Sequence, residues 1–227
     1  MTTFLKVEKK CAVCGATSQQ AELGSTSIFG KPDLDGRPAE LARSTIDMWV
    51  ERCPSCGYCA KDLSEAEEGA SEVVQTARYR SQLDDEEYPQ LANSFLCLSL
   101  IQEHMGRYAK AGWSSVHAAW ACDDEKCQDA ARRCRMRALT LFEKARKKDQ
   151  IISREPGAED AIMVDLMRRS GLFESALELC DRALAKSPDA TISRILGFER
   201  MLILGKDDVC HTIEEALGEA GPGREIP

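Results

Sequence analysis

The chain has 227 residues, a formal net charge of -8 and a sequence pI near 5.1. The acidic balance argues against a general nucleic-acid coat, which needs a basic surface. No window approaches the roughly 18 uncharged apolar residues of a membrane span, so no membrane partner is expected. The N-terminal stretch MTTFLKVEKK lacks the apolar run of a secretion signal. These features predict a cytoplasmic protein.

The cysteine content points to a bound metal. The chain holds eleven cysteines, an odd number that internal disulfides cannot pair completely. The cytosol keeps thiols reduced, so clustered cysteines there favour metal binding over a disulfide framework.

The first part of the chain, residues 1–62, is rich in turn-forming glycine and proline. FLKVEKK and IDMWVER read as two short strands, and each leads into a pair of cysteines. We therefore predict a small, β-containing, zinc-ribbon-like domain over residues 1–62.

Two CxxC pairs carry the clearest chemistry. Cys11 pairs with Cys14, and Cys53 pairs with Cys56; a glycine follows each pair. A two-residue spacer lets a tight turn aim both thiolates at one ion, and the glycine supplies the backbone freedom that the turn needs. Two such turns predict a closed, tetrahedral, structural Zn(II) site. Iron with the same ligands and plain reduced thiols are the alternatives.

Some features near the pairs leave alternatives open. Cys59 is either a further ligand or a small buried residue beside the second turn. The long interval between Cys14 and Cys53 indicates an inserted loop that contains FGKPDLDGRP. Asp33 and Asp35 faintly suggest a calcium loop, but the distal glutamate is missing, so a turn is the better interpretation.

From residue 63 the pattern becomes helical, and we predict an all-α domain over residues 63–218 and a flexible tail over 219–227. Ser64 and Glu67 form a capping-box pattern, which predicts a helix start. Pro89 suits the first turn of the next helix. The later helices are expected to be separated at these residues: Gly112, Pro156, Gly171, Pro188 and Gly205.

The segment RRSGLFESALELCDRALAKSPDA resembles the second half of a tetratricopeptide repeat. Ala176 and Ala183 are seven residues apart, and small residues let antiparallel helices approach closely. Ala138 and Ala145 repeat this spacing. We predict tetratricopeptide-like antiparallel helix pairs; a non-repetitive helical bundle is the alternative.

Several other residue sets have a functional and a structural interpretation. Trp113, His117 and Trp120 share one helix face, which forms either a binding groove or a packing contact between helices. A second metal site is a weaker reading of four residues that match no knuckle spacing: His117, Cys122, Cys127 and Cys134. We expect the remaining cysteines to be core residues: Cys97, Cys180 and Cys210.

Residues 131–154 hold nine basic residues against two acidic ones. Such a segment either meets phosphate or an acidic partner, or pairs with acids of the same chain on a solvated helix. Aromatic residues are nearly absent from it, which weakens a single-stranded nucleic-acid reading.

The stretches FLKVEKKCAVCG, PDLDGRP, CPSCGY and SGLFESALELCDRAL together resemble an uncharacterised bacterial zinc-ribbon family with a repeat-like helical tail. The resemblance implies the same four metal ligands and carries no reaction. No phosphate loop, nucleophile elbow, HExxH or dinucleotide fingerprint is present. We expect a non-catalytic interaction module for a protein or peptide. The alternatives are nucleic-acid binding through the ribbon and residues 131–154, an enzyme with a site between the two regions, and a thiol or metal sensor.

Overall fold

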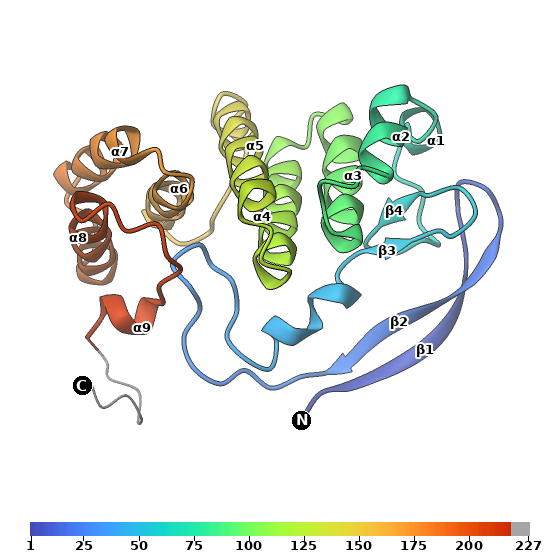
Figure 1. Cartoon of the computed structure of the whole chain (residues 1–227), viewed down its shortest axis with the longest axis horizontal. Coiled ribbons are helices and arrows are strands. Elements are labelled where there is room, and N and C mark those ends of the chain that lie inside the picture. Colours follow the sequence, from blue (N-terminus) through green and yellow to red (C-terminus); the bar gives the residue numbers. More distant parts are fainter. Residues whose placement is uncertain (219–227) are drawn as a thin grey trace. The chain divides into compact units, whose positions relative to one another are not determined.

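The computed structural model describes residues 1–218 and is mainly helical, with small antiparallel strands near the N-terminus (Figure 1). This confirms the predicted fold class. The chain forms two compact units: unit 1 contains residues 1–27 and 44–152, and unit 2 contains residues 28–43 and 153–218. Each unit contains residues from both sides of the predicted boundary between residues 62 and 63. That domain boundary stays a prediction. The predicted tail, residues 219–227, lies outside the described residues.

Two β-hairpins form the front of unit 1. Strands β1 (Thr3–Lys10) and β2 (Thr17–Ser25) pair antiparallel, and so do β3 (Glu51–Arg52) and β4 (Cys59–Ala60). In each hairpin the chain between the strands contains one CxxC pair. The first hairpin confirms the strand predicted over FLKVEKK.

The strand predicted over IDMWVER is wrong except at its last two residues. Its first three residues belong to a short 3-10 helix, η1 (Arg43–Met48). Trp49 explains the difference, because its indole N–H donates to the hydroxyl of Thr45 at 3.0 Å and its ring contacts that of His117. The side chain therefore packs inward instead of alternating along a strand.

Four antiparallel helices follow in unit 1, each beside the next (Figure 1). The four helices are α2 (Ala77–Leu83), α3 (Gln90–His104), α4 (Tyr108–Asp124) and α5 (Gln128–Arg146). A short helix, α1 (Ala70–Val73), precedes α2. Pro89 directly precedes the first residue of α3, close to the predicted position.

Two predicted helix boundaries in unit 1 are wrong. No helix starts at Ser64; the Tyr58 hydroxyl donates to the carbonyl of Glu65 at 2.8 Å and holds that stretch in turns. Gly112 lies inside α4, where an added Cβ would stand 2.4 Å from the Phe142 ring of α5. Close approach of α4 and α5, not chain reversal, explains this glycine.

Unit 2 consists of packed helices and one inserted loop. Its helices are α6 (Ala158–Arg169), α7 (Phe173–Ala185), α8 (Ala190–Leu204) and the short α9 (Ile213–Ala216). Gly171 and Pro188 separate α6, α7 and α8 as predicted. Residues 32–37 form a turn, in which the N–H of Gly36 donates to the carbonyl of Asp33 at 2.9 Å. This agrees with a turn in PDLDG.

The small residues of the predicted repeats lie in helix contacts. Ala176 and Ala183 of α7 are buried, and so are Ala138 and Ala145 of α5. Their spacing puts each pair on one helix face, which is the face turned toward the core. None of the helices within residues 1–218 combines the length and the apolar character needed to cross a membrane.

Candidate metal centre

The two CxxC pairs occupy matching turns at the ends of the two hairpins. In the first turn the N–H of Gly15 donates to the carbonyl of Cys11 at 2.8 Å; in the second, the N–H of Gly57 donates to that of Cys53 at 2.9 Å. Gly15 and Gly57 have φ angles of 76° and 74°, a conformation that favours glycine. The glycines after the pairs therefore have the role that the sequence predicted for them.

The turns bring all four predicted sulfurs into one cluster. The four Sγ atoms lie within 4.8 Å of one another. The Sγ atoms of Cys11 and Cys56 are 3.7 Å apart, and those of Cys14 and Cys53 are 3.6 Å apart. These separations exceed the ~2.05 Å of a disulfide. Four thiolates around one zinc ion, at ~2.3 Å each, would lie about 3.8 Å apart, so the cluster fits a tetrahedral ion.

Backbone N–H groups face the first sulfur of each pair. Burial acts to raise the pKa of the Cys53 thiol, but hydrogen bonds from the N–H groups of Cys56 and Ser55 lower it to about 7. The N–H groups of Cys14 and Val13 act in the same direction on Cys11, whose pKa burial nevertheless raises. N–H groups aimed at sulfur stabilise a thiolate, which is the form that binds metal.

The four sulfurs form a complete ligand set. Cys11 and Cys53 are buried, Cys56 is half-buried and Cys14 is exposed. A tetrahedral ion held by four protein ligands has no open position for water or substrate. The arrangement can thus hold a metal that stabilises the fold, and it offers no site for metal-activated chemistry.

A buried ion pair links the two hairpins next to the cluster. The Lys9 ammonium of β1 lies 2.7 Å from the carboxylate of Glu51 in β3, and both side chains are buried. The other oxygen of Glu51 accepts from the N–H of Leu63 at 2.7 Å. Burial acts to lower the pKa of Lys9, but hydrogen bonds to Glu22, Glu51 and Asp62 raise it. Lys9 therefore stays charged and fixes one hairpin against the other.

We predict that Lys9→Met destabilises unit 1 by about 3 to 5 kcal/mol, because Glu51 would remain buried without its counter-charge. The double variant Lys9→Met/Glu51→Leu should recover part of that loss, since no unpaired charge is left. Urea unfolding with zinc in excess measures both. A single variant as stable as the unsubstituted chain would contradict the role given to this pair.

The remaining cysteines do not join the cluster. Cys59 is fully buried and its thiol donates to the carbonyl of Gly57 at 3.4 Å, so the structure favours the small buried residue over a further ligand. Within residues 1–218 the alternative set around His117 and Cys122 forms no second cluster of metal-binding side chains. Cys97 and Cys180 are buried helix residues, as predicted. Cys210 is not; it is exposed and lies after α8.

The face of α4 with Trp113, His117 and Trp120 is a packed aromatic cluster. The ring centroids of His117 and Trp120 are 4.9 Å apart, and Trp49 meets the His117 ring edge-on at 5.2 Å. The indole N–H of Trp113 donates to the carbonyl of Ile152 at 2.9 Å. These contacts favour packing over a binding groove.

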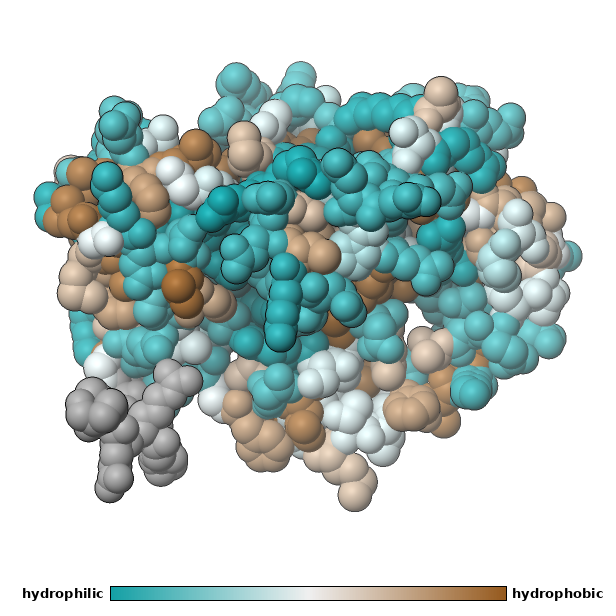
Figure 2. Space-filling model, in the orientation of Figure 1, coloured by the Kyte–Doolittle hydropathy of each residue, from teal (hydrophilic) through white to brown (hydrophobic). Residues whose placement is uncertain are grey.

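The basic side chains of residues 131–154 are largely engaged with carboxylates of unit 1. Arg137 and Lys144 both contact Glu103 at 2.8 Å, and Arg133 contacts Glu87 at 3.2 Å. Burial acts to raise the pKa of Glu103, but hydrogen bonds from Lys144 and Arg137 lower it to about 2. The surface over α4 and α5 is mostly hydrophilic in Figure 2. Intramolecular pairing thus explains much of this segment.

Sequence reasoning missed a set of buried charges inside unit 2. Arg169 of α6 lies 2.9 Å from the carboxylate of Asp35, and both are buried. Arg168 is fully buried, pairs with Asp165 and donates to the carbonyls of Asp207 and Val209. Asp33 of the same loop pairs with Arg43, so both aspartates of PDLDG have arginine partners. Two adjacent arginines at the end of a helix are typical of a solvated surface. No local sequence signal could therefore reveal that Arg168 and Arg169 are buried.

No family model matches the chain, no curated protein matches it, and no solved structure matches it. The resemblance to a bacterial zinc-ribbon family therefore stays an expectation carried by the motif residues.

Proposed function

We propose that this protein is a zinc-stabilised, non-catalytic module that binds a protein or peptide through its helices. The observation that carries the proposal is the closed cluster of Cys11, Cys14, Cys53 and Cys56 at the turns of two hairpins. Four thiolates favour zinc among the common cellular divalent ions, and a complete ligand set points to a structural role. A ligand set that is complete supports a stabilising role for the bound metal over a role in a reaction.

The helices support the second half of the proposal. Successive antiparallel helices with small residues in their contacts, as in α6 and α7, suit a tetratricopeptide-like array. Such arrays present extended surfaces that recognise peptides. The paired cations of residues 131–154 leave fewer charges for phosphate, which favours a protein partner over nucleic acid.

Affinity capture of the tagged full chain, with and without nuclease, tests this function. We expect proteins that survive nuclease treatment, and we expect the purified chain to bind a recovered partner directly. Binding should weaken only modestly with added salt, because a peptide ligand lacks the phosphates whose neutralisation makes nucleic-acid binding strongly dependent on salt. Recovery of nucleic acid alone with a steep salt dependence, or no direct binding of any recovered protein, would overturn the proposal.

A further inference from the structure

Unit 2 contains two adjoining pockets around the start of α8. The first has a volume of about 340 Å³ and the second of about 420 Å³. Both are lined by Pro156, Asp189 and Ile192, so they meet along this shared wall. Volumes of this order suit an inserted apolar side chain with part of its backbone, and two joined pockets suit an extended ligand.

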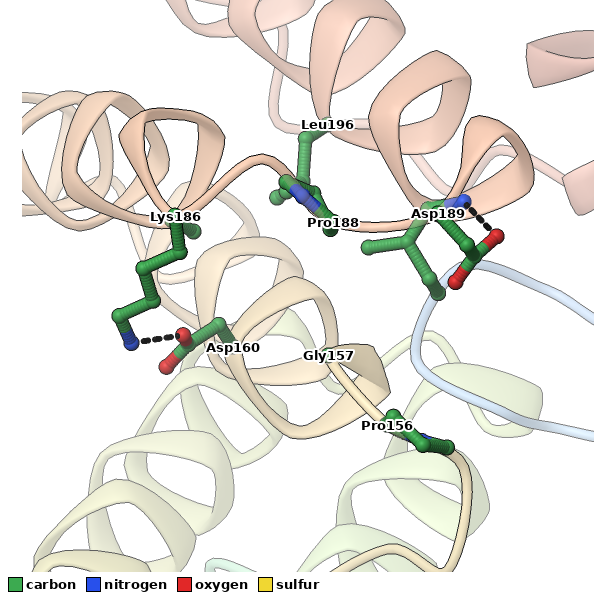
Figure 3. Close-up of a pocket in the computed structure, with 9 residues that line it drawn as sticks. Pro156, Gly157, Asp160, Lys186, Pro188, Asp189 and Leu196 are labelled. Atoms are coloured by element: carbon green, nitrogen blue, oxygen red, sulfur yellow. Dashed lines mark hydrogen bonds and ion pairs between the residues drawn. The ribbon is translucent and has the colours of Figure 1, made fainter.

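The floors of both pockets are apolar. Ala183 and Leu196 line the first, in addition to Ile192, and Figure 3 shows Leu196 beside Pro188 at its inner wall. Ile162 and Ile195 are among the residues that line the second. On α8, Leu196 lines the first pocket and the adjacent Ile195 lines the second. Ile192 lines both pockets and therefore forms the ridge between them. Each pocket therefore has the chemistry to accept one aliphatic side chain.

The charged residues at these pockets have a net acidic balance. Lys186 and Asp160 neutralise each other across the first pocket, with Nζ and a carboxylate oxygen 2.7 Å apart (Figure 3). Asp189 uses its carboxylate to accept the N–H groups of Thr191 and Ile192. Among the described residues, no cation pairs with Asp189 or Glu155, and Glu155 lines the second pocket. Both carboxylates are exposed, so the pockets carry a net negative charge at their edge, which favours a positive charge on the ligand.

We infer that these two pockets are the groove through which the protein binds an extended peptide with two aliphatic side chains and a neighbouring arginine or lysine. This inference rests on the proposed interaction function and specifies its ligand. The aliphatic side chains fill the pockets on either side of Ile192, and the cation lies near the carboxylates of Glu155 and Asp189. The groove lies entirely in unit 2.

The probe is a short capped peptide, labelled for fluorescence anisotropy, with leucine, isoleucine and arginine at alternate positions among glycines and serines. In an extended chain this spacing turns all three side chains to the face that meets the groove. Controls replace the arginine with glutamate, or both aliphatic residues with alanine. We expect either control to bind the full chain at least about tenfold more weakly, because each loses about 1.4 kcal/mol or more. Equal binding of the glutamate peptide would overturn the charge assignment and with it the inference.

Two matched chain variants place the site. Thr191→Trp puts an indole into the second pocket from an exposed position of α8 and should weaken peptide binding at least about tenfold. Gly197→Trp adds the same side chain to α8, where an added Cβ meets no atom within 4 Å, and should leave binding unchanged. Thermal unfolding of both variants verifies that they fold. Equal peptide binding by both tryptophan variants would overturn the groove assignment.

Binding of the captured protein partner distinguishes a wrong groove assignment from a wrong interaction function. If it binds the Thr191→Trp chain as tightly as the unsubstituted chain, the groove assignment is wrong and the interaction function stands. If neither the peptide nor any captured protein binds the unsubstituted chain, the interaction function itself is wrong.

Discussion

Substitution of Cys53 and Cys56 by serine is expected to abolish tight metal binding and to unfold the first hairpin of unit 1, β1 and β2. This hairpin has little apolar core because most of β1 and β2 is exposed, so a bound ion and the Lys9–Glu51 pair are expected to hold it against the second hairpin, whose strand β4 is buried. Structural zinc contributes about 10 to 16 kcal/mol in small zinc-binding peptides, so its loss should dominate the local stability. Metal analysis and hydrogen exchange by mass spectrometry measure the two effects.

The matched control is Cys59→Ala. Cys59 is a buried cysteine of the same hairpin that lies outside the four-sulfur cluster. The Cys59→Ala variant should retain one ion per chain, and its hairpins should stay protected from hydrogen exchange. Helices α6–α8 of unit 2 should stay protected from exchange in both variants. Full metal content in the double serine variant would contradict the assignment of Cys53 and Cys56 as ligands.

The second large effect is expected at Glu199, in α8. Its carboxyl group is fully buried, and neither oxygen has a hydrogen-bond partner within the described structure. Burial raises its pKa well above the usual range, and the nearby carboxylates of Asp165 and Asp35 add to this against the opposing charge of Arg168. Cys180 of α7 also lies near it. A group that is this poorly solvated should destabilise unit 2 whenever it ionises.

The sign of the pH dependence follows from the raised pKa. An unfolded glutamate loses its proton near pH 4.3, whereas the folded chain keeps this one to higher pH. Between those values the folded state binds more protons, so its stability falls as the pH rises. Glu199→Met removes this loss and should stabilise unit 2 by about 1 to 3 kcal/mol at pH 8.

Urea unfolding of unit 2 between pH 5 and 9 measures this prediction. The Met variant should show a shallower fall in stability with pH than the unsubstituted chain. Some slope should remain, because burial also raises the pKa of Asp165 and Asp33. A variant that is less stable at pH 8, or one that keeps the full slope, would contradict the description of Glu199 as an unpaired buried acid.

The cluster of four cysteines could be predicted because its chemistry is local. Each knuckle needs only a CxxC pair and the glycine after it, and all of these residues are adjacent in sequence. The pairing of the two knuckles then follows from the need of one ion for four ligands. The same locality made α7 predictable, since Gly171 and Pro188 mark its limits.

Features that depend on distant residues were not predictable. Arg169 is buried because Asp35, 134 positions away in sequence, supplies its counter-charge. Gly112 looks like a helix end, but the ring of Phe142 in another helix explains it. Cys210 was expected in the core, yet it is exposed in the chain that follows α8. In each case a tertiary contact or chain reversal decides what local pattern leaves undetermined.

X-ray absorption at the zinc edge, on the full chain purified without added metal, tests the four-sulfur centre most directly. We predict one zinc ion per chain with four sulfur neighbours at about 2.3 Å and no nitrogen or oxygen in the first coordination shell. A chain without a stoichiometric metal, or a zinc ion with fewer than four sulfur neighbours, would contradict the closed structural site.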